Sequence, residues 1–139
     1  MPSRESRKLA GILLLVFPSV IYGGASLLGF ILGKQPGYLD NQVRQDLFRA
    51  GHAHAGVLLI LSLVALRYVD EARLPPWWKL VVRNGIPSSA IFLPAGFFFS
   101  VLTPSAKEPN GFIYLAFAGA LMLAVSLAAL GVGLLRNRE

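Results

Sequence analysis

The sequence predicts an all-α protein, an integral membrane four-helix bundle with both termini in the cytoplasm. Of the 139 residues, 55% are hydrophobic and 14% are charged, whereas an ordinary soluble domain has about 25% charged residues. The apolar residues form four long stretches. Most Lys and Arg residues fall in the two termini and the second loop, which four spans would put on the same side of a membrane. No separate soluble domain is expected, so residues 1–139 are predicted to form a single membrane domain.

Each of the four stretches is long enough to cross a bilayer, which takes about 20 apolar residues. The expected spans are residues 9–33, 50–66, 84–106 and 110–135. The first stretch is longer than the apolar core of a signal peptide, about 7–15 residues, and no A-x-A pattern follows it. It is therefore expected to remain as a membrane span. Small residues at 116, 120, 124 and 128 predict a packing face on the fourth span, within one chain or between chains.

The distribution of basic residues predicts the orientation. Nine belong to the two termini and the second loop: Arg4, Arg7, Lys8, Arg67, Arg73, Lys79, Arg83, Arg136 and Arg138. Four belong to the first and third loops: Lys34, Arg44, Arg49 and Lys107. Because Lys and Arg concentrate on the cytoplasmic side, both termini are expected there, in the inner cell membrane with the lipid bilayer as partner. Trp77 and Trp78 are expected to anchor the third span at the membrane surface.

Composition also disfavours several functions. The chain has no cysteine, which excludes disulfides, thiolate metal sites, iron–sulfur clusters and covalently attached c-type haem. No Asp or Glu falls inside the four stretches, although ion-coupled transport and proton pumping normally need such carboxylates. The net charge of +6 is ordinary beside anionic lipid, and no basic helix with interleaved aromatics indicates a nucleic-acid partner.

The unusual segment is residues 49–56, RAGHAHAG, which opens the second predicted span and contains both histidines of the chain. An ionisable residue inside a span is a functional hypothesis by default, and histidine is a common haem and metal ligand. Residues two apart on a helix diverge by about 200°, so His52 and His54 cannot bind one metal ion from one intact helix. The alternative is that both lie near the water boundary, hydrogen-bonded to loop carbonyls.

A haem b fits the sequence around His54. The residues expected on its face are small or apolar: Ala50, Gly51, Val57, Leu58 and Leu61. Small residues leave space for a flat macrocycle, and the apolar ones keep it dry. Arg49, or less favourably Arg44, is expected to pair with a haem propionate. The ordinary alternative for Arg49 is an interfacial arginine at a helix start.

Four segments of the chain resemble the styrene oxide isomerase family, small four-helix membrane enzymes that carry haem b. They are RKLAG at 7–11, QPGY at 35–38, AHAG at 53–56, and GFFFS at 96–100 followed by Pro104. The resemblance implies that His54 is the axial haem ligand and that the protein is a homo-oligomer with haem near its subunit interfaces. It also implies that ferric haem acts as a Lewis acid on an aryl epoxide, and that a 1,2-hydride shift then gives the aldehyde.

A substrate pocket is predicted from the same comparison. An aromatic wall that stabilises a developing cation is expected from rings of the third and fourth spans: Phe92, Phe97, Phe98, Phe99, Phe112 and Tyr114. Rings at such positions are also ordinary packing residues. Ile60 stands where the family has an Asn six residues after the ligand, and the family's Tyr within the third-helix aromatic stretch is missing here. Two alternatives stay open: a haem-binding membrane protein without isomerase activity (electron transfer, haem handling or gas sensing), and a structural protein that binds nothing.

Overall fold

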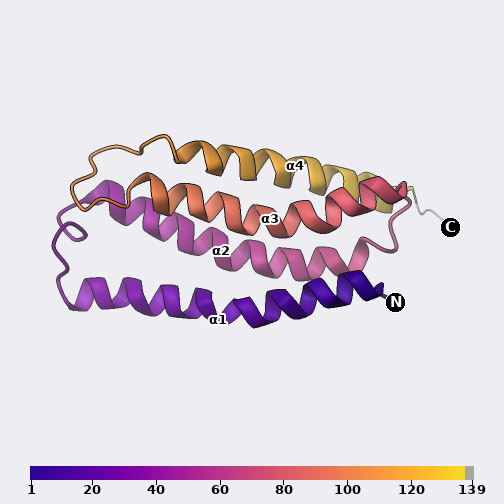
Figure 1. Cartoon of the computed structure of the whole chain (residues 1–139), viewed down its shortest axis with the longest axis horizontal. Helices are drawn as coiled ribbons and strands as arrows, with labels where there is room; N and C mark the ends of the chain where they lie inside the picture. Colours follow the sequence, from indigo (N-terminus) through magenta and orange to yellow (C-terminus); the bar gives the residue numbers. More distant parts are fainter. Residues whose placement is uncertain (137–139) are drawn as a thin grey trace.

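The computed structural model describes residues 1–136 and consists of four long helices that run side by side (Figure 1). They are α1 (Arg4–Leu32), α2 (Gln42–Tyr68), α3 (Pro76–Ser100) and α4 (Ile113–Leu135). Successive helices run in opposite directions, so the described ends of the chain lie at the same end of the bundle (Figure 1). The predicted all-α four-helix bundle is confirmed. Arg138, one of the basic residues used for the predicted orientation, lies outside the described residues.

Three of the described helices, α1, α2 and α4, are long and apolar enough to cross a membrane, which suggests a multi-pass membrane protein. The remaining helix, α3, has 25 residues but includes Lys79, Arg83 and Asn84 in its first half, which lower its hydropathy more than Pro87 and Pro94 do. The helix α2 begins at Gln42, eight residues before the apolar stretch that predicted the second span. The Asn41 side chain caps this earlier start by accepting a hydrogen bond from the Arg44 N–H.

The core lies where α3 packs between α2 and α4. Glycines bring α3 and α4 unusually close together. A methyl group added to Gly96 would lie 2.3 Å from the backbone N of Ala116, and one added to Gly119 would lie 2.8 Å from the backbone N of Leu93. In contrast, α1 packs mainly on α2 and buries only Ser6 and Leu13. Most of the apolar surface of α1 is therefore left for lipid or another chain.

The loop between α1 and α2 is fastened to the loop after α3. Gly37 adopts a left-handed backbone conformation with φ of 71°, and a methyl group there would lie 2.6 Å from Pro104 Cβ. Asn41 Nδ2 donates hydrogen bonds to the carbonyls of Pro104 and Ala106 at 3.0 and 2.8 Å. These contacts fix the end of the bundle opposite the termini.

An ionic cluster fixes the other end. The Arg83 guanidinium donates to Glu5 at 2.6 Å and to Asp70 at 2.7 Å, and the Ser3 N–H donates to Asp70 at 2.9 Å. Burial by itself would raise the pKa of Asp70, but the hydrogen bonds from Ser3, Ser6 and Arg83, together with the charge of Arg83, lower this pKa to about 2. The cluster joins the start of α1 to the α2–α3 connection and to α3.

Candidate functional site

His54 lies in the middle of α2 on an exposed face of the chain. Its Nδ1 is 2.7 Å from the carbonyl oxygen of Ala50, one turn earlier. Since a carbonyl can only accept, Nδ1 carries the proton and donates it, which leaves the Nε2 lone pair available for a ligand. A hydrogen bond of this kind from the other ring nitrogen is typical of metal-ligating histidines. The partner of His54 is thus a helical carbonyl, not a loop carbonyl.

His52 points elsewhere, toward α1. A methyl group on Gly24 would lie 3.0 Å from His52 Nε2, and one on Gly23 would lie 3.6 Å from His52 Nδ1. These two glycines therefore make room for a half-buried imidazole between α1 and α2. The two histidines diverge as their spacing predicts. Within residues 1–136 no three His, Cys, Asp or Glu side chains gather into a metal-binding group.

The residues expected around His54 divide between two environments. Ala50 supplies the carbonyl that holds the ring. Gly51 faces α3 instead, where a methyl group would lie 3.0 Å from the ring of Phe98, and Leu58 is only 3% exposed within the core. Gly51 and Leu58 therefore serve the contact between α2 and α3. The ring of Phe97 lies beside His54, and helical geometry puts the exposed Val57 about 60° around α2 from it.

The two arginines expected to hold propionates are engaged with other groups. Arg49 donates to Gln45 Oε1 at 2.9 Å, and helical geometry puts it about 140° around α2 from His54. Arg44 is 8% exposed and donates to the carbonyls of Val101, Leu102 and Gly37. Its guanidinium also lies 4.8 Å from the ring centre of Phe48. Arg44 thus fastens the end of α3, and the structure does not bring either arginine to His54.

The three consecutive phenylalanines of the predicted substrate wall point in different directions. The ring centre of Phe97 lies 5.3 Å from that of His54. Phe98 packs edge-on against Phe48 at 5.4 Å, inside the bundle, and Phe99 packs edge-on against Phe112 at 6.0 Å. Only the first of the three rings therefore lies beside the candidate ligand.

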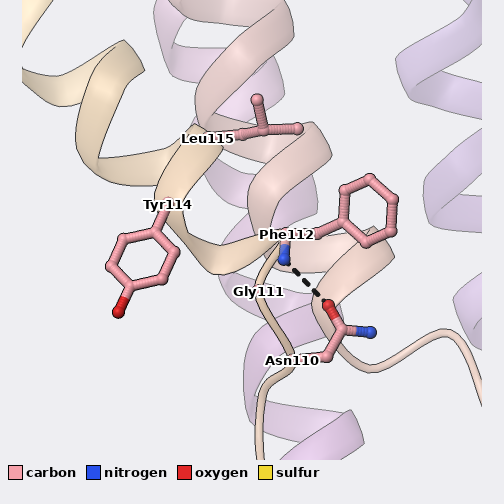
Figure 2. Close-up of a pocket in the computed structure, with 5 residues that line it drawn as sticks. All are labelled: Asn110, Gly111, Phe112, Tyr114 and Leu115. Carbon is pink, nitrogen blue, oxygen red and sulfur yellow. Dashed lines mark hydrogen bonds between the residues drawn. The ribbon is translucent and has the colours of Figure 1, made fainter.

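Ile60 is also separate from His54. It is 54% exposed, and helical geometry puts it about 120° around α2 from the imidazole. A hollow of about 470 Å³ lies near the start of α4, lined by Asn110, Gly111, Phe112, Tyr114 and Leu115. Figure 2 shows the Asn110 side chain accepting a hydrogen bond from the Phe112 N–H, while Tyr114 points away from that pair. The hollow adjoins Phe99 through Phe112 and not His54.

An aromatic cluster was not anticipated from composition or spacing. Tyr38 is 1% exposed, and its ring lies 5.4 Å from Phe30 and 6.1 Å from Phe48. Its hydroxyl has no hydrogen-bond partner among the described residues. The QPGY segment was the available signal, because the left-handed Gly37 turns the chain so that Tyr38 enters the cluster.

Together, these features define a four-helix, all-α protein with three helices of membrane-spanning length and an outward-facing histidine at mid-helix. Comparisons of the chain with protein-family models, with curated proteins and with solved structures gave no match. The resemblance to the styrene oxide isomerases therefore stays a prediction from the sequence.

Proposed function

We propose that the chain is an inner-membrane protein in which all four helices cross the bilayer and both termini are cytoplasmic. The apolar lengths of α1, α2 and α4 support this proposal. α3 lies between α2 and α4 and packs along both. If its two neighbours cross the bilayer, α3 crosses it with them. Its polar Ser89 and Ser100 are no more than 1% exposed, and both hydroxyls donate to helical carbonyls, which removes most of the cost of holding them in hydrocarbon.

Within that membrane protein, His54 is the proposed axial ligand of a haem b. The supporting observation is the 2.7 Å contact between Nδ1 and the Ala50 carbonyl, which orients the ring and leaves Nε2 available on an exposed face. Helical geometry puts the apolar Ala50 and Val57 within about 60° of His54 around α2, and small or apolar neighbours suit a macrocycle. The donor set therefore fits haem at the iron, where one imidazole suffices.

The propionates need a basic partner that the face of His54 does not supply, because Arg49 and Arg44 are turned away from it. Arg49 is exposed and is therefore available to a neighbouring copy. A homo-oligomer in which a second copy covers the His54 face would supply the missing charge and also the missing wall. The oligomer is part of the proposal for this reason.

The proposed reaction converts an aryl epoxide to its aldehyde. Bound ferric haem would supply a Lewis acid for the epoxide oxygen. The face of Phe97 beside His54 would stabilise positive charge developing at the benzylic carbon, and the apolar surroundings would exclude the water that gives a diol. The isomerisation has no net proton transfer, so the lack of Asp and Glu in the predicted spans is compatible with it.

A second candidate is a haem-binding membrane protein without isomerase activity, acting in electron transfer, haem handling or gas sensing. It is favoured by the separation of Phe98, Phe99 and Ile60 from His54. Among the described residues, no polar side chain is hydrogen-bonded to the His54 ring, whose partner is the Ala50 carbonyl. An open axial position on the iron would favour the first candidate, and a second protein ligand there would favour this one.

The test uses the full chain purified in detergent. The wild type is expected to show the visible absorption of haem b. His54→Ala should lose most of it, whereas the matched His52→Ala variant should keep it because His52 faces α1. The ferric wild type is then assayed with styrene oxide, with phenylacetaldehyde measured by chromatography. Equal haem retention in the two variants would contradict the ligand assignment, and a haem-loaded ferric protein that makes no aldehyde from several epoxides would select the second candidate.

A further inference from the structure

A second hollow lies at the end of the bundle that carries the chain termini. It has a volume of about 490 Å³ and lies between the first residues of α3 and the last three turns of α4. Its lining runs along α4 from Val125 to Arg136, a distance of about 16 Å on a helix. That length is about half the roughly 30 Å thickness of the hydrocarbon core, or the depth of one leaflet.

The walls of the hollow suit an acyl chain. Trp77 and Trp78 form one side, with ring centres 4.5 Å apart, and Trp77 is 58% exposed. On the α4 side, the short side chains of Ala128 and Ala129 leave room for a ligand in the hollow. Tryptophan prefers the boundary between hydrocarbon and headgroups, so the hollow would open at the depth where a phospholipid headgroup meets its chains.

The mouth of the hollow is basic. Arg136 lines it, and the Arg73 N–H donates to the Gly133 carbonyl at 2.9 Å, which holds Arg73 beside the end of α4. Arg73 and Arg136 are both exposed. None of the described residues that line this hollow is acidic.

A neighbouring hollow on the other side of Trp77 is less suited to an anion. Its charged lining residues are Glu5, Lys79 and Arg83. The Arg83 guanidinium is already paired with Glu5 and Asp70, and Lys79 Nζ already donates to the Asp70 carbonyl at 2.7 Å. Of the two hollows that border Trp77, the one on the α4 side therefore suits an anionic ligand better.

We propose that the hollow between the Trp77–Trp78 pair and α4 binds an anionic phospholipid of the cytoplasmic leaflet. One acyl chain lies along Ala128 and Ala129, and the phosphate pairs with Arg73 and Arg136. Basic residues at a membrane surface attract anionic lipid, and the groove adds a place for the chain. The inference rests on the proposed membrane placement and orientation, and it is independent of haem.

Trp77 and Trp78 are the only tryptophans of the chain and both line this hollow, so their fluorescence reports on it. Trp77 also borders the neighbouring hollow, and the arginine variants distinguish the two. The full chain is reconstituted in phosphatidylcholine vesicles with increasing fractions of brominated phosphatidylglycerol or of brominated phosphatidylcholine. Half-maximal quenching is expected at a roughly tenfold lower mole fraction of the brominated phosphatidylglycerol, given two arginines at the mouth. Arg73→Gln with Arg136→Gln should abolish this preference. Lys34→Gln with Lys107→Gln, which removes two charges at the opposite end, should leave it unchanged.

Equal dependence on the two brominated lipids in the wild type would overturn the proposal, and so would a preference that survives in the Arg73, Arg136 double variant. Absence of quenching by either lipid would overturn the membrane placement as well. Visible absorption recorded on the same samples reports on haem separately. A sample that lacks haem but keeps the lipid preference would therefore contradict only the haem part of the proposed function.

Discussion

Gly96 sets the distance between α3 and α4, and adding one methyl group there should destabilise the protein. In Gly96→Ala the new Cβ would lie 2.3 Å from Ala116 N and 2.8 Å from Ala116 Cβ, where ordinary contact begins at 3.4 Å. Both neighbours belong to the helix that must move, so α3 and α4 would separate by about 1 Å. A gap of that size forfeits roughly a quarter to a half of each dispersion contact across the interface.

The matched control is Gly131→Ala, because Gly131 is in α4 and a methyl group there meets nothing within 4 Å. Replacing a helical Gly by Ala otherwise stabilises a helix by up to about 1 kcal/mol. Overpacking costs about 1–3 kcal/mol, so the two variants should differ by about 3 kcal/mol in free energy of unfolding. Thermal unfolding of the detergent-purified proteins, followed by circular dichroism, should give Gly96→Ala a midpoint about 5–10 °C below that of Gly131→Ala.

Because Gly96 precedes Phe97, which contacts His54, the same separation should alter the surroundings of the candidate ligand. A Gly96→Ala protein as stable as Gly131→Ala would refute the close approach of α3 and α4 at Gly96 and Ala116.

Two further predictions concern the ends of the bundle. Because the pKa of Asp70 falls from 3.8 to about 2 on folding, its carboxylate stabilises the fold above pH 4, and this contribution of about 1–2 kcal/mol is lost as the pH falls from 4 toward 2. Asp70→Asn should remove that part of the pH dependence, as measured by the unfolding midpoint between pH 2 and pH 7. At the other end, Arg44→Met would leave the carbonyls of Val101 and Leu102 without their donor and should cost about 2–4 kcal/mol of stability. Arg67→Met, whose exposed ion pair with Glu71 contributes little, is its control; equal stability of these two variants would contradict the role of Arg44.

Hydrophobic stretches predicted the four helices but not where they end. The apolar run of the second stretch marks a segment suited to hydrocarbon. The helix itself extends beyond this run, as far as the residue that caps its backbone. Asn41 caps α2 eight residues before the apolar run begins. Arg44, Gln45 and Arg49 are therefore helical, although their polarity indicated a loop.

The packing face of α4 could not be predicted from small residues alone. The expected face repeats every four residues from Ala116, but the buried residues of α4 are Ala116, Gly119, Ser126, Leu130 and Gly133. Their spacings of three, seven, four and three residues follow the alternation of three and four in a heptad repeat, which is that of left-handed helix packing, whereas a strict four-residue repeat belongs to right-handed crossings. Which of these two packing geometries forms depends on the residues that α3 presents to α4. The sequence of α4 by itself does not contain this information.

Sequence spacing predicted the divergence of the two histidines, because it follows from the 100° rotation per residue alone. It did not predict which neighbours occupy each direction. Gly51 was expected to make space for a cofactor, but the space is filled by Phe98. Arg49 precedes His54 by five residues, which puts it about 140° around α2 from the imidazole, where it donates to Gln45 instead.

The depth of His54 connects the proposed placement with the need for a ligand. On a helix that rises 1.5 Å per residue, His54 lies about 18 Å from Gln42 and about 21 Å from Tyr68, the two ends of α2. The predicted span of residues 50–66 is centred on Leu58, so it would hold this imidazole within the hydrocarbon, about 6 Å from the midplane and about 7.5 Å along the helix from Arg49. Nδ1 is satisfied there by the Ala50 carbonyl, but Nε2 faces outward, and a buried polar atom without a partner costs about 1–3 kcal/mol by mutational measures. Bare lipid cannot supply that partner. The proposed haem, enclosed by a second copy of the chain, would supply a partner for Nε2 and remove this cost.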